Sequence, residues 1–250
     1  MAEPILEVRD LRKSFGGVRA VDGFALSVSE FETHAVIGPN GAGKTTLIAQ
    51  LSGMLKPDSG AIRFRGRDIT EVPAHRRSRL GLARSFQITS VFRDMTVIDN
   101  VALAIQAHAG HSFRFWMPAR RDPDLTEPAL QMLREVDLAE RAHDLASALS
   151  HGEQRQLEIA MALATSPAML LLDEPMAGMG PEESRRMVET LQRLKGEKTM
   201  LLVEHDMDVV FALADTITVM VDGRVIASGP PQAIRSDEHV RRAYLGEEGG

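Results

Sequence analysis

Residues 38–45, Gly-Pro-Asn-Gly-Ala-Gly-Lys-Thr, have the spacing of a phosphate-binding loop. The glycines let the backbone curl so that N–H groups point at phosphate oxygens, and the helix predicted next adds its positive N-terminal end. Lys44 supplies a mobile charge for the β- and γ-phosphates, and Thr45 a hydroxyl ligand for magnesium. The pattern therefore predicts binding of a magnesium-bound nucleoside triphosphate rather than a turn that only caps a helix. The nucleotide contacts are expected from Gly38, Asn40, Gly41, Ala42, Gly43, Lys44, Thr45 and Thr46.

Two carboxylates, Asp173 and Glu174, follow the apolar run 169–172. Open α/β sheets bind their ligands at the carboxyl ends of their strands. We expect Asp173 to hold magnesium, directly or through water, and Glu174 to polarise the attacking water. Alone, the pair would more simply end a strand before Pro175, but the phosphate-binding loop upstream favours the chemical interpretation.

His205 lies between Glu204 and Asp206 at the end of another apolar strand. A metal site built from all three is disfavoured, because adjacent strand residues point to opposite faces of the sheet. The residues alone leave two interpretations open for His205: a structural hydrogen-bonding histidine and a group that faces phosphate.

Residues 149–154, Leu-Ser-His-Gly-Glu-Gln, resemble the LSGGQ signature of ATP-binding-cassette (ABC) ATPases. A serine that caps a helix would explain Ser150 but not the position of the motif shortly before the acidic strand. The resemblance covers nearly the whole chain. It implies a P-loop NTPase (RecA-like) α/β core with an N-terminal antiparallel β subdomain and an inserted α-helical subdomain.

The resemblance also implies roles for single residues. Phe15 stands where the family stacks an aromatic ring on adenine, although a core phenylalanine is the simpler alternative. Gln87 resembles the Q-loop glutamine, which touches magnesium and water and faces the permease, and His205 resembles the switch histidine at the γ-phosphate. The implied catalytic residues are Glu174, His205, Lys44 and Gln87, and the implied magnesium ligands are Thr45, Gln87 and Asp173.

The implied working unit is a dimer, either of identical chains or with a second ABC ATPase. Ser150 and Gly152 of one subunit would close over the nucleotide held by the loop of the other. Hydrolysis of ATP to ADP and phosphate would then drive a membrane permease that receives its solute from a periplasmic or extracellular binding protein. We expect a peripheral location on the cytoplasmic face of the membrane and no nucleic-acid partner.

Four passages resemble the larger of the two ATPase types in branched-chain amino-acid importers: residues 86–92, 96–100, 173–179 and 241–246. The irregular segment around Trp116 fits the same type. A urea, aromatic-acid or lipopolysaccharide transporter is the alternative within transport. Outside transport, an ABC ATPase of chromosomes or ribosomes would need coiled-coil inserts or tandem cassettes, and a P-loop kinase would lack the signature.

Two positions depart from the family pattern. His151 replaces the first glycine of the signature and adds a side chain near the neighbouring subunit's nucleotide, which is tolerable where it points away from phosphate. Gly180 stands where most members have the D-loop aspartate, which puts communication across the dimer interface there in doubt.

Apolar periodicity predicts the elements that position these residues. The predicted strands are 5–11, 24–28, 33–37, 61–66, 169–173, 199–204, 216–221 and 224–227, and the predicted helices are 44–55, 153–164, 181–194 and 207–214. Alternating strands and helices indicate a mostly parallel sheet. Residues 71–150 lose strand alternation, so we expect a helical subdomain there and the ATP-binding core, with its antiparallel lobe, in residues 1–70 and 151–250.

Composition excludes several classes of protein. The chain has 250 residues, a net charge of −6 and no cysteine, which rules out disulfides and thiolate zinc sites. An acidic balance gives no global attraction to nucleic acid or anionic lipid. No signal peptide or membrane-length apolar run is evident. The basic clusters 75–79 and 118–121 are predicted to be solvated faces, with permease or lipid-headgroup contact as the alternative.

Overall fold

The computed structural model describes residues 3–84, 91–109 and 122–242, and its strands form two sheets. The antiparallel sheet has the order β2-β1-β4-β5, and the second sheet has the order β10-β9-β3-β8-β7-β6, parallel except for β10. The strands are β1 Leu6–Phe15, β2 Val18–Val28, β3 Thr33–Ile37, β4 Ser59–Phe64, β5 Arg67–Asp68, β6 Leu82–Arg84, β7 Met169–Asp173, β8 Thr199–Val203, β9 Thr216–Val221 and β10 Arg224–Gly229.

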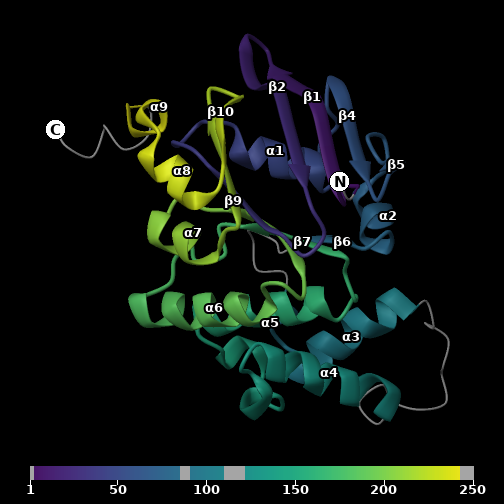
Figure 1. Cartoon of the computed structure of the whole chain (residues 1–250). Helices are drawn as coiled ribbons and strands as arrows, with labels where there is room; N and C mark the ends of the chain where they lie inside the picture. The colour runs from purple at the N-terminus through teal and green to yellow at the C-terminus, as the bar shows by residue number, and fades with distance from the viewer. Residues whose placement is uncertain (1–2, 85–90, 110–121, 243–250) are drawn as a thin grey trace.

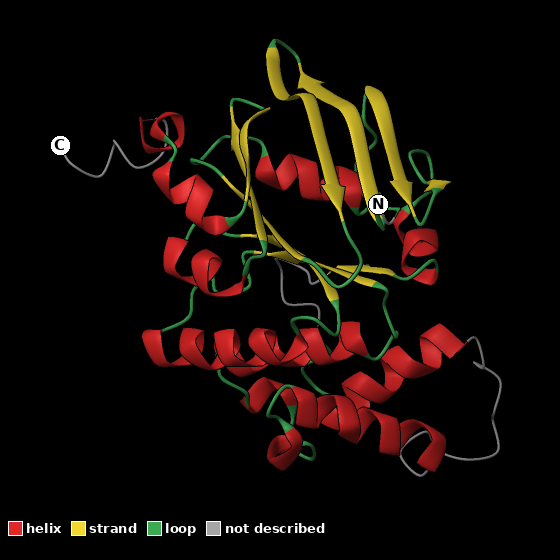
Figure 2. Cartoon of the chain, in the orientation of Figure 1, coloured by secondary structure: helices red, strands yellow, loops and turns green. Residues whose placement is uncertain are grey.

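The helices lie on both faces of the second sheet (Figures 1 and 2). They are α1 Lys44–Leu51, α2 Ala74–Arg79, α3 Val97–Ala109, α4 Pro123–Glu135, α5 His151–Leu163, α6 Pro181–Leu194, α7 Met207–Leu213, α8 Pro231–Ser236 and α9 Glu238–Val240, with 3-10 turns at η2 Ala139–Arg141 and η3 Ala146–Ala148. Figure 1 shows α1 between the two sheets and α3 to α6 together on the other side. Within the described ranges, no helix has the length and apolar character that a membrane crossing requires.

The central strands are buried on both faces because their side chains alternate between two hydrophobic cores. Leu170, Leu172 and Leu202 pack into the core formed with α3 to α6. Met169, Leu171 and Leu201 pack into the core shared with α1 and the antiparallel sheet. The α/β architecture with an antiparallel β subdomain and a helical subdomain is therefore confirmed.

Several predictions for the elements were wrong. β1 continues to Phe15 rather than ending at residue 11, and β2 begins at Val18 rather than at residue 24. The first helix ends at Leu51 rather than at residue 55, because Gly53 has a φ of 78° and takes the chain out of the helix. The region 71–150 also contains a strand, β6, which pairs in parallel with β7 at the edge of the main sheet. We propose to place the start of the helical subdomain after β6.

The basic cluster 75–79 is not uniformly solvated. Arg77 is 1% exposed, and its guanidinium donates to the carbonyl oxygens of Gln50 (2.8 Å) and Leu51 (2.7 Å) at the end of α1. It also donates to the carbonyls of Val72 (2.7 Å) and Thr70 (3.0 Å). Burial lowers its pKa to about 10, which leaves the side chain charged at neutral pH. Arg77 therefore ties α2 to the carboxyl end of the helix that follows the phosphate-binding loop.

Candidate nucleotide site

The strand order brings four polar strand ends to one edge of the main sheet. β3, β8, β7 and β6 are consecutive neighbours and all parallel, so their carboxyl ends share that edge. The phosphate-binding loop follows β3, His205 follows β8, Asp173 ends β7 and Arg84 ends β6. Segments far apart in the sequence therefore meet beside the amino end of α1.

The loop has the backbone that its glycines were predicted to allow. Gly41 and Gly43 have φ values of 84° and 103°, in the left-handed region that disfavours side chains. A Cβ on Gly38 would lie 2.0 Å from the carbonyl oxygen of Met220, and one on Gly43 equally close to that of Ala20. Glycine is thus required both by the backbone angles and by packing against β9 and β2.

Lys44 is buried and folds back over the loop. Its Nζ donates to the carbonyl oxygens of Gly38 (2.5 Å) and Pro39 (3.0 Å). Burial lowers the pKa of Lys44, and the negative charges of Glu174, Asp173 and Glu204 oppose that shift. The ammonium therefore lies within electrostatic reach of the carboxylates on the neighbouring strands, in a loop curved for an anion.

Asp173 is buried and paired with an arginine that the sequence did not single out. Arg84 Nη2 donates to Asp173 Oδ2 at 2.9 Å, and Arg84 Nη1 donates to the hydroxyl of Ser52 at 3.2 Å. Burial raises the pKa of Asp173, and the charge of Arg84 opposes that rise. No local sequence pattern predicts the Arg84–Asp173 pair, because the two residues are 89 positions apart. They are brought together by the pairing of β6 with β7.

Glu174 has an unusual backbone for a long side chain. Its φ is 47°, and its N–H donates to the carbonyl of Val203 on β8 at 2.9 Å. Such left-handed residues are held by surrounding contacts and gather at functional sites. His205 Nδ1 lies 4.0 Å from Glu174 Oε1, so the side chains from the ends of β7 and β8 meet.

Glu204 and His205 lie just beyond the end of β8, and Glu204 Oε2 is 3.7 Å from His205 Nδ1. Glu204 is fully buried and accepts from the backbone N–H groups of Met176 (3.1 Å) and His205 (3.0 Å), while the side chain of His205 is 61% exposed. Burial raises the pKa of Glu204, and these N–H donors oppose the rise. In the described part of the chain, no cluster of three acidic, histidine or cysteine residues could hold a metal by itself.

The residues present fit magnesium bound together with a nucleotide. Thr45 at the start of α1 and the buried carboxylate of Asp173 offer oxygen ligands, which this cation prefers. Phosphate oxygens would complete such a site. The third expected ligand, Gln87, lies outside the described residues.

Ser150 and Gly152 lie at the start of α5, away from the four strand ends in their described contacts. Ser150 caps the helix: its hydroxyl accepts from the N–H of Glu153 (3.2 Å), whose side chain accepts from the N–H of Ser150 (2.8 Å). His151 is exposed, and its ring lies near Gly178. A Cβ placed on Gly178 would be 3.3 Å from Cε1 of His151. The signature thus presents a serine hydroxyl and a helix N-terminus.

Phe15 ends β1, and its ring is exposed rather than part of the core. It is 53% exposed, and Lys13 Nζ lies 5.7 Å from the ring centroid. The hairpin continues into β2, where Ala20 contacts the phosphate-binding loop at Gly43. An exposed ring on the same hairpin is available for stacking.

The structure brings together Lys44, Asp173, Glu174 and His205. It places Phe15 on the adjoining hairpin and holds Ser150 and Gly152 in a separate group with α6. Two further residues of these groups, Arg84 and Glu183, have no motif in the sequence that indicates them; they bind Asp173 and Ser150 respectively.

Comparison with known proteins identifies the family of this chain. A family model described as ABC transporter matches residues 21–177, and one described as branched-chain amino acid ATP-binding cassette transporter matches residues 224–250. The high-affinity branched-chain amino acid transport ATP-binding protein BraF of Pseudomonas aeruginosa is 41% identical, covering 99% of this chain and 100% of BraF. LivG of Escherichia coli K12, with the same description, is 39% identical, with coverage of 99% and 100%.

A solved structure matches over the same length. The ADP conformation of MJ1267, an ATP-binding cassette of an ABC transporter, has a TM-score of 0.85 and 32% sequence identity, covering 98% of this chain and 100% of MJ1267. The phosphate-binding loop, the acidic strand end and the signature therefore lie in a cassette fold that is matched from end to end. The chain belongs to the ABC transporter ATPases, as an ATP-binding protein of the branched-chain amino acid transport type.

Proposed function

We propose that this ATPase energises the import of branched-chain amino acids through a membrane permease. The observation that carries the proposal is the end-to-end similarity to ATP-binding proteins of branched-chain amino acid transport, which includes the C-terminal region 224–250. Its chemistry would use the residues at the shared edge of the main sheet.

In this proposal, the loop 38–45 wraps the phosphates and Lys44 offsets the charge of the β- and γ-phosphates. Glu174 orients the water that attacks the γ-phosphorus as the bond to the bridging oxygen breaks, and His205 stabilises the moving phosphoryl group. Thr45, Asp173 and Gln87 would hold magnesium, which would neutralise phosphate charge. Arg84 holds the Asp173 carboxylate in place until the nucleotide arrives.

The proposed working unit is a dimer. Ser150 and Gly152 have their described contacts with α5 and α6, not with the chain's own phosphate-binding loop. A second chain would bring its signature over the γ-phosphate, so that ATP favours the closed dimer and hydrolysis removes that advantage.

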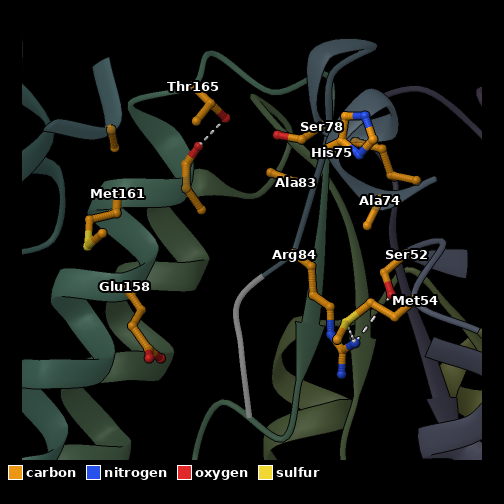
Figure 3. A pocket seen from close by; sticks show the side chains of 13 residues that line it. Ser52, Met54, Ala74, His75, Ser78, Ala83, Arg84, Glu158, Met161 and Thr165 are labelled. Atoms are coloured by element: carbon orange, nitrogen blue, oxygen red, sulfur yellow. Dashed lines mark hydrogen bonds between the residues drawn. The ribbon is translucent and has the colours of Figure 1, made fainter. Parts of the chain in front are cut away.

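The proposed permease contact is a groove between the core and the helical elements. Figure 3 shows Glu158 and Met161 of α5, with Thr165 just beyond the end of that helix, on one side and Ser52, Met54 and Arg84 on the other. The cavity has a volume of about 420 Å³ and a mainly apolar lining. Arg84, which lines the groove, stands three positions in the sequence before Gln87, the residue expected to face the permease. We therefore assign to it a short, mainly apolar permease segment.

Co-expression with candidate permease subunits for branched-chain amino acids tests this function. We expect the chain to copurify with the permease from membranes, and the complex in vesicles to take up leucine, isoleucine or valine only with ATP. A Glu174→Gln complex, assembled in the same way, is the matched control and should not transport. Uptake of urea or an aromatic acid in place of these amino acids would assign the solute to the alternative systems.

Replacing Phe15 with Ala is expected to weaken ATP binding about tenfold, because base–aromatic stacking contributes about 1–3 kcal/mol per base. The rate at saturating ATP should change little, since Phe15 lies outside the group that surrounds the γ-phosphate. Calorimetric titration with Mg-ATP and steady-state kinetics measure the two effects separately.

Phe31→Ala provides the control for this variant. Phe31 is equally exposed, at 53%, but it precedes β3, whereas the phosphate-binding loop follows that strand. Its replacement should leave ATP affinity unchanged, and Phe15→Trp should retain the affinity of the parent. An unaltered dissociation constant in Phe15→Ala would refute the stacking role.

A further inference from the structure

The donor groups of the signature are occupied by a carboxylate from the same chain. The hydroxyl of Ser150 donates to Glu183 Oε1 at 2.8 Å, and the backbone N–H of Gly152 points at the same oxygen at 3.4 Å. These are the two groups proposed to meet the γ-phosphate held by the partner subunit. An anion from α6 therefore lies where the phosphate has to bind.

The fold of α6 places Glu183 there. Gly180 precedes the helix and has no side chain to cap it, and Glu183 reaches back so that its Oε2 accepts from the N–H of Gly180 at 3.4 Å. Its Cδ lies so near Gly152 that a Cβ there would be 2.8 Å away. Hydrogen bonds lower the pKa of Glu183: the one from Ser150 has the largest effect, and the one from the N–H of Gly180 the next largest. The carboxylate is therefore charged at neutral pH.

The carboxylate and a phosphate exclude each other at this position. Ser150 has one hydroxyl proton, and its oxygen already accepts from the N–H of Glu153, so the proton serves either Glu183 or a phosphate oxygen. Two anions on the same donors also repel each other. Closure of the dimer therefore requires Glu183 to leave Ser150.

We propose that Glu183 is a positioning residue that holds the signature in its nucleotide-free form and sets the ATP concentration at which the dimer closes. The inference rests on the proposed dimer, since the competing phosphate comes from the second subunit. The carboxylate of Glu183 keeps the hydrogen-bond donors of Ser150 and Gly152 aligned. The γ-phosphate of ATP takes the place of this carboxylate when the ATP concentration is high enough.

Glu183→Gln separates this role from helix capping. Glutamine at the third position of a helix retains a carbonyl oxygen that caps the preceding N–H, but it carries no charge. A purely structural Glu183 would thus be replaced without effect on ATP-dependent closure. Glu182→Gln is the matched control, because Glu182 is the adjacent carboxylate and pairs with Arg186 at 2.7 Å instead of with the signature.

The experiment measures dimer formation by light scattering as a function of Mg-ATP concentration. All chains carry Glu174→Gln, so that bound ATP persists. We expect Glu183→Gln to lower the ATP concentration at the midpoint about fivefold, the size typical of one exposed charge contact. Glu182→Gln should keep the midpoint of the parent, and thermal unfolding should be the same for all three proteins.

Three results would overturn the inference in distinguishable ways. If the parent forms dimers with ATP but Glu183→Gln has an equal or higher midpoint, the carboxylate does not compete with phosphate and the proposed dimer stands. If the parent forms no dimer at any ATP concentration, the proposed dimer itself fails and the inference fails with it. An equal decrease in Glu182→Gln would assign the effect to overall charge and would also reject the specific role of Glu183.

Discussion

Replacing Glu174 with Gln is expected to reduce ATP hydrolysis about 10³-fold while ATP binding persists. Positioned general bases contribute about 10²–10⁴ to rates, and glutamine keeps the size of the side chain without a carboxylate to orient water. ATP-bound dimers should then accumulate, because bound ATP stabilises the closed dimer and is no longer hydrolysed. Phosphate release measures the rate, and calorimetry with Mg-ATP measures binding.

The control for Glu174 is a carboxylate at the other edge of the sheet. Glu197 is exposed and precedes β8, whereas Glu174 follows β7 at the edge that carries the phosphate-binding loop. Glu197→Gln changes the net charge equally and should hydrolyse ATP at the parent rate. If Glu174→Gln hydrolysed ATP at the parent rate, the role of Glu174 in orienting the attacking water would be contradicted.

The backbone at Glu174 gives this prediction a structural basis. A residue with a φ of 47° costs free energy that its neighbours must offset, here through the N–H bond to Val203. The bond ties the orientation of Glu174 to β8, which ends beside His205. The sequence shows only that a glutamate follows an aspartate, so neither this backbone nor the link to β8 could be predicted from it.

The central strands could be predicted because each is a short apolar run with clear ends. Met169–Asp173 and Thr216–Val221 have the predicted bounds, and Pro181 at the first position of α6 marks the start of that helix as expected. β6 could not be found in this way. It has only three residues, and its extended form depends on pairing with β7, a neighbour far away in the sequence.

The residues of the candidate site also differ in whether the sequence could indicate them. Lys44, Asp173 and Ser150 could be predicted as site residues from short motifs. Lys44 is indicated by its own loop, Asp173 needs the phosphate-binding loop upstream as support, and Ser150 depends on the resemblance of residues 149–154 to the signature. Arg84 and Glu183 act on those motifs from other elements, across 89 and 33 positions. Their types are common in any sequence, and only the packing of β6 on β7 and of α6 on α5 shows their partners.

Arg77 was misread for a related reason. Its neighbours Arg76 and Arg79 are exposed, and a cluster of arginines is typical of a solvated surface. Four carbonyl oxygens, two of them from the last turn of α1, make the buried position possible. The negative end of a helix and a cation stabilise each other, so the charge needs no carboxylate.

Replacing Arg77 with Met is expected to lower the free energy of unfolding by about 3 kcal/mol, because each buried carbonyl left without a donor costs about 1–3 kcal/mol. Methionine fills much of the volume but donates no hydrogen bond, so the carbonyl of Leu51 loses its side-chain donor in a buried place and that of Gln50 keeps the N–H of Gly53. Urea denaturation followed by circular dichroism measures the change. Because α1 carries Lys44 at its other end, ATP affinity should fall along with stability.

Arg76→Met and Arg77→Lys are the controls for this loss of stability. The first tests loss of an exposed arginine on the same helix, and the second tests loss of the guanidinium with the charge kept. Arg76 is exposed on the same helix, so its replacement should change the free energy of unfolding by less than about 0.5 kcal/mol. Lysine at position 77 keeps the charge but lacks the planar fork that reaches carbonyls on both sides, and its stability should lie between those of the parent and Arg77→Met. A lysine variant as stable as the parent would show that the charge beside α1 suffices. Equal losses in Arg76→Met and Arg77→Met would show that the four carbonyl contacts contribute nothing specific.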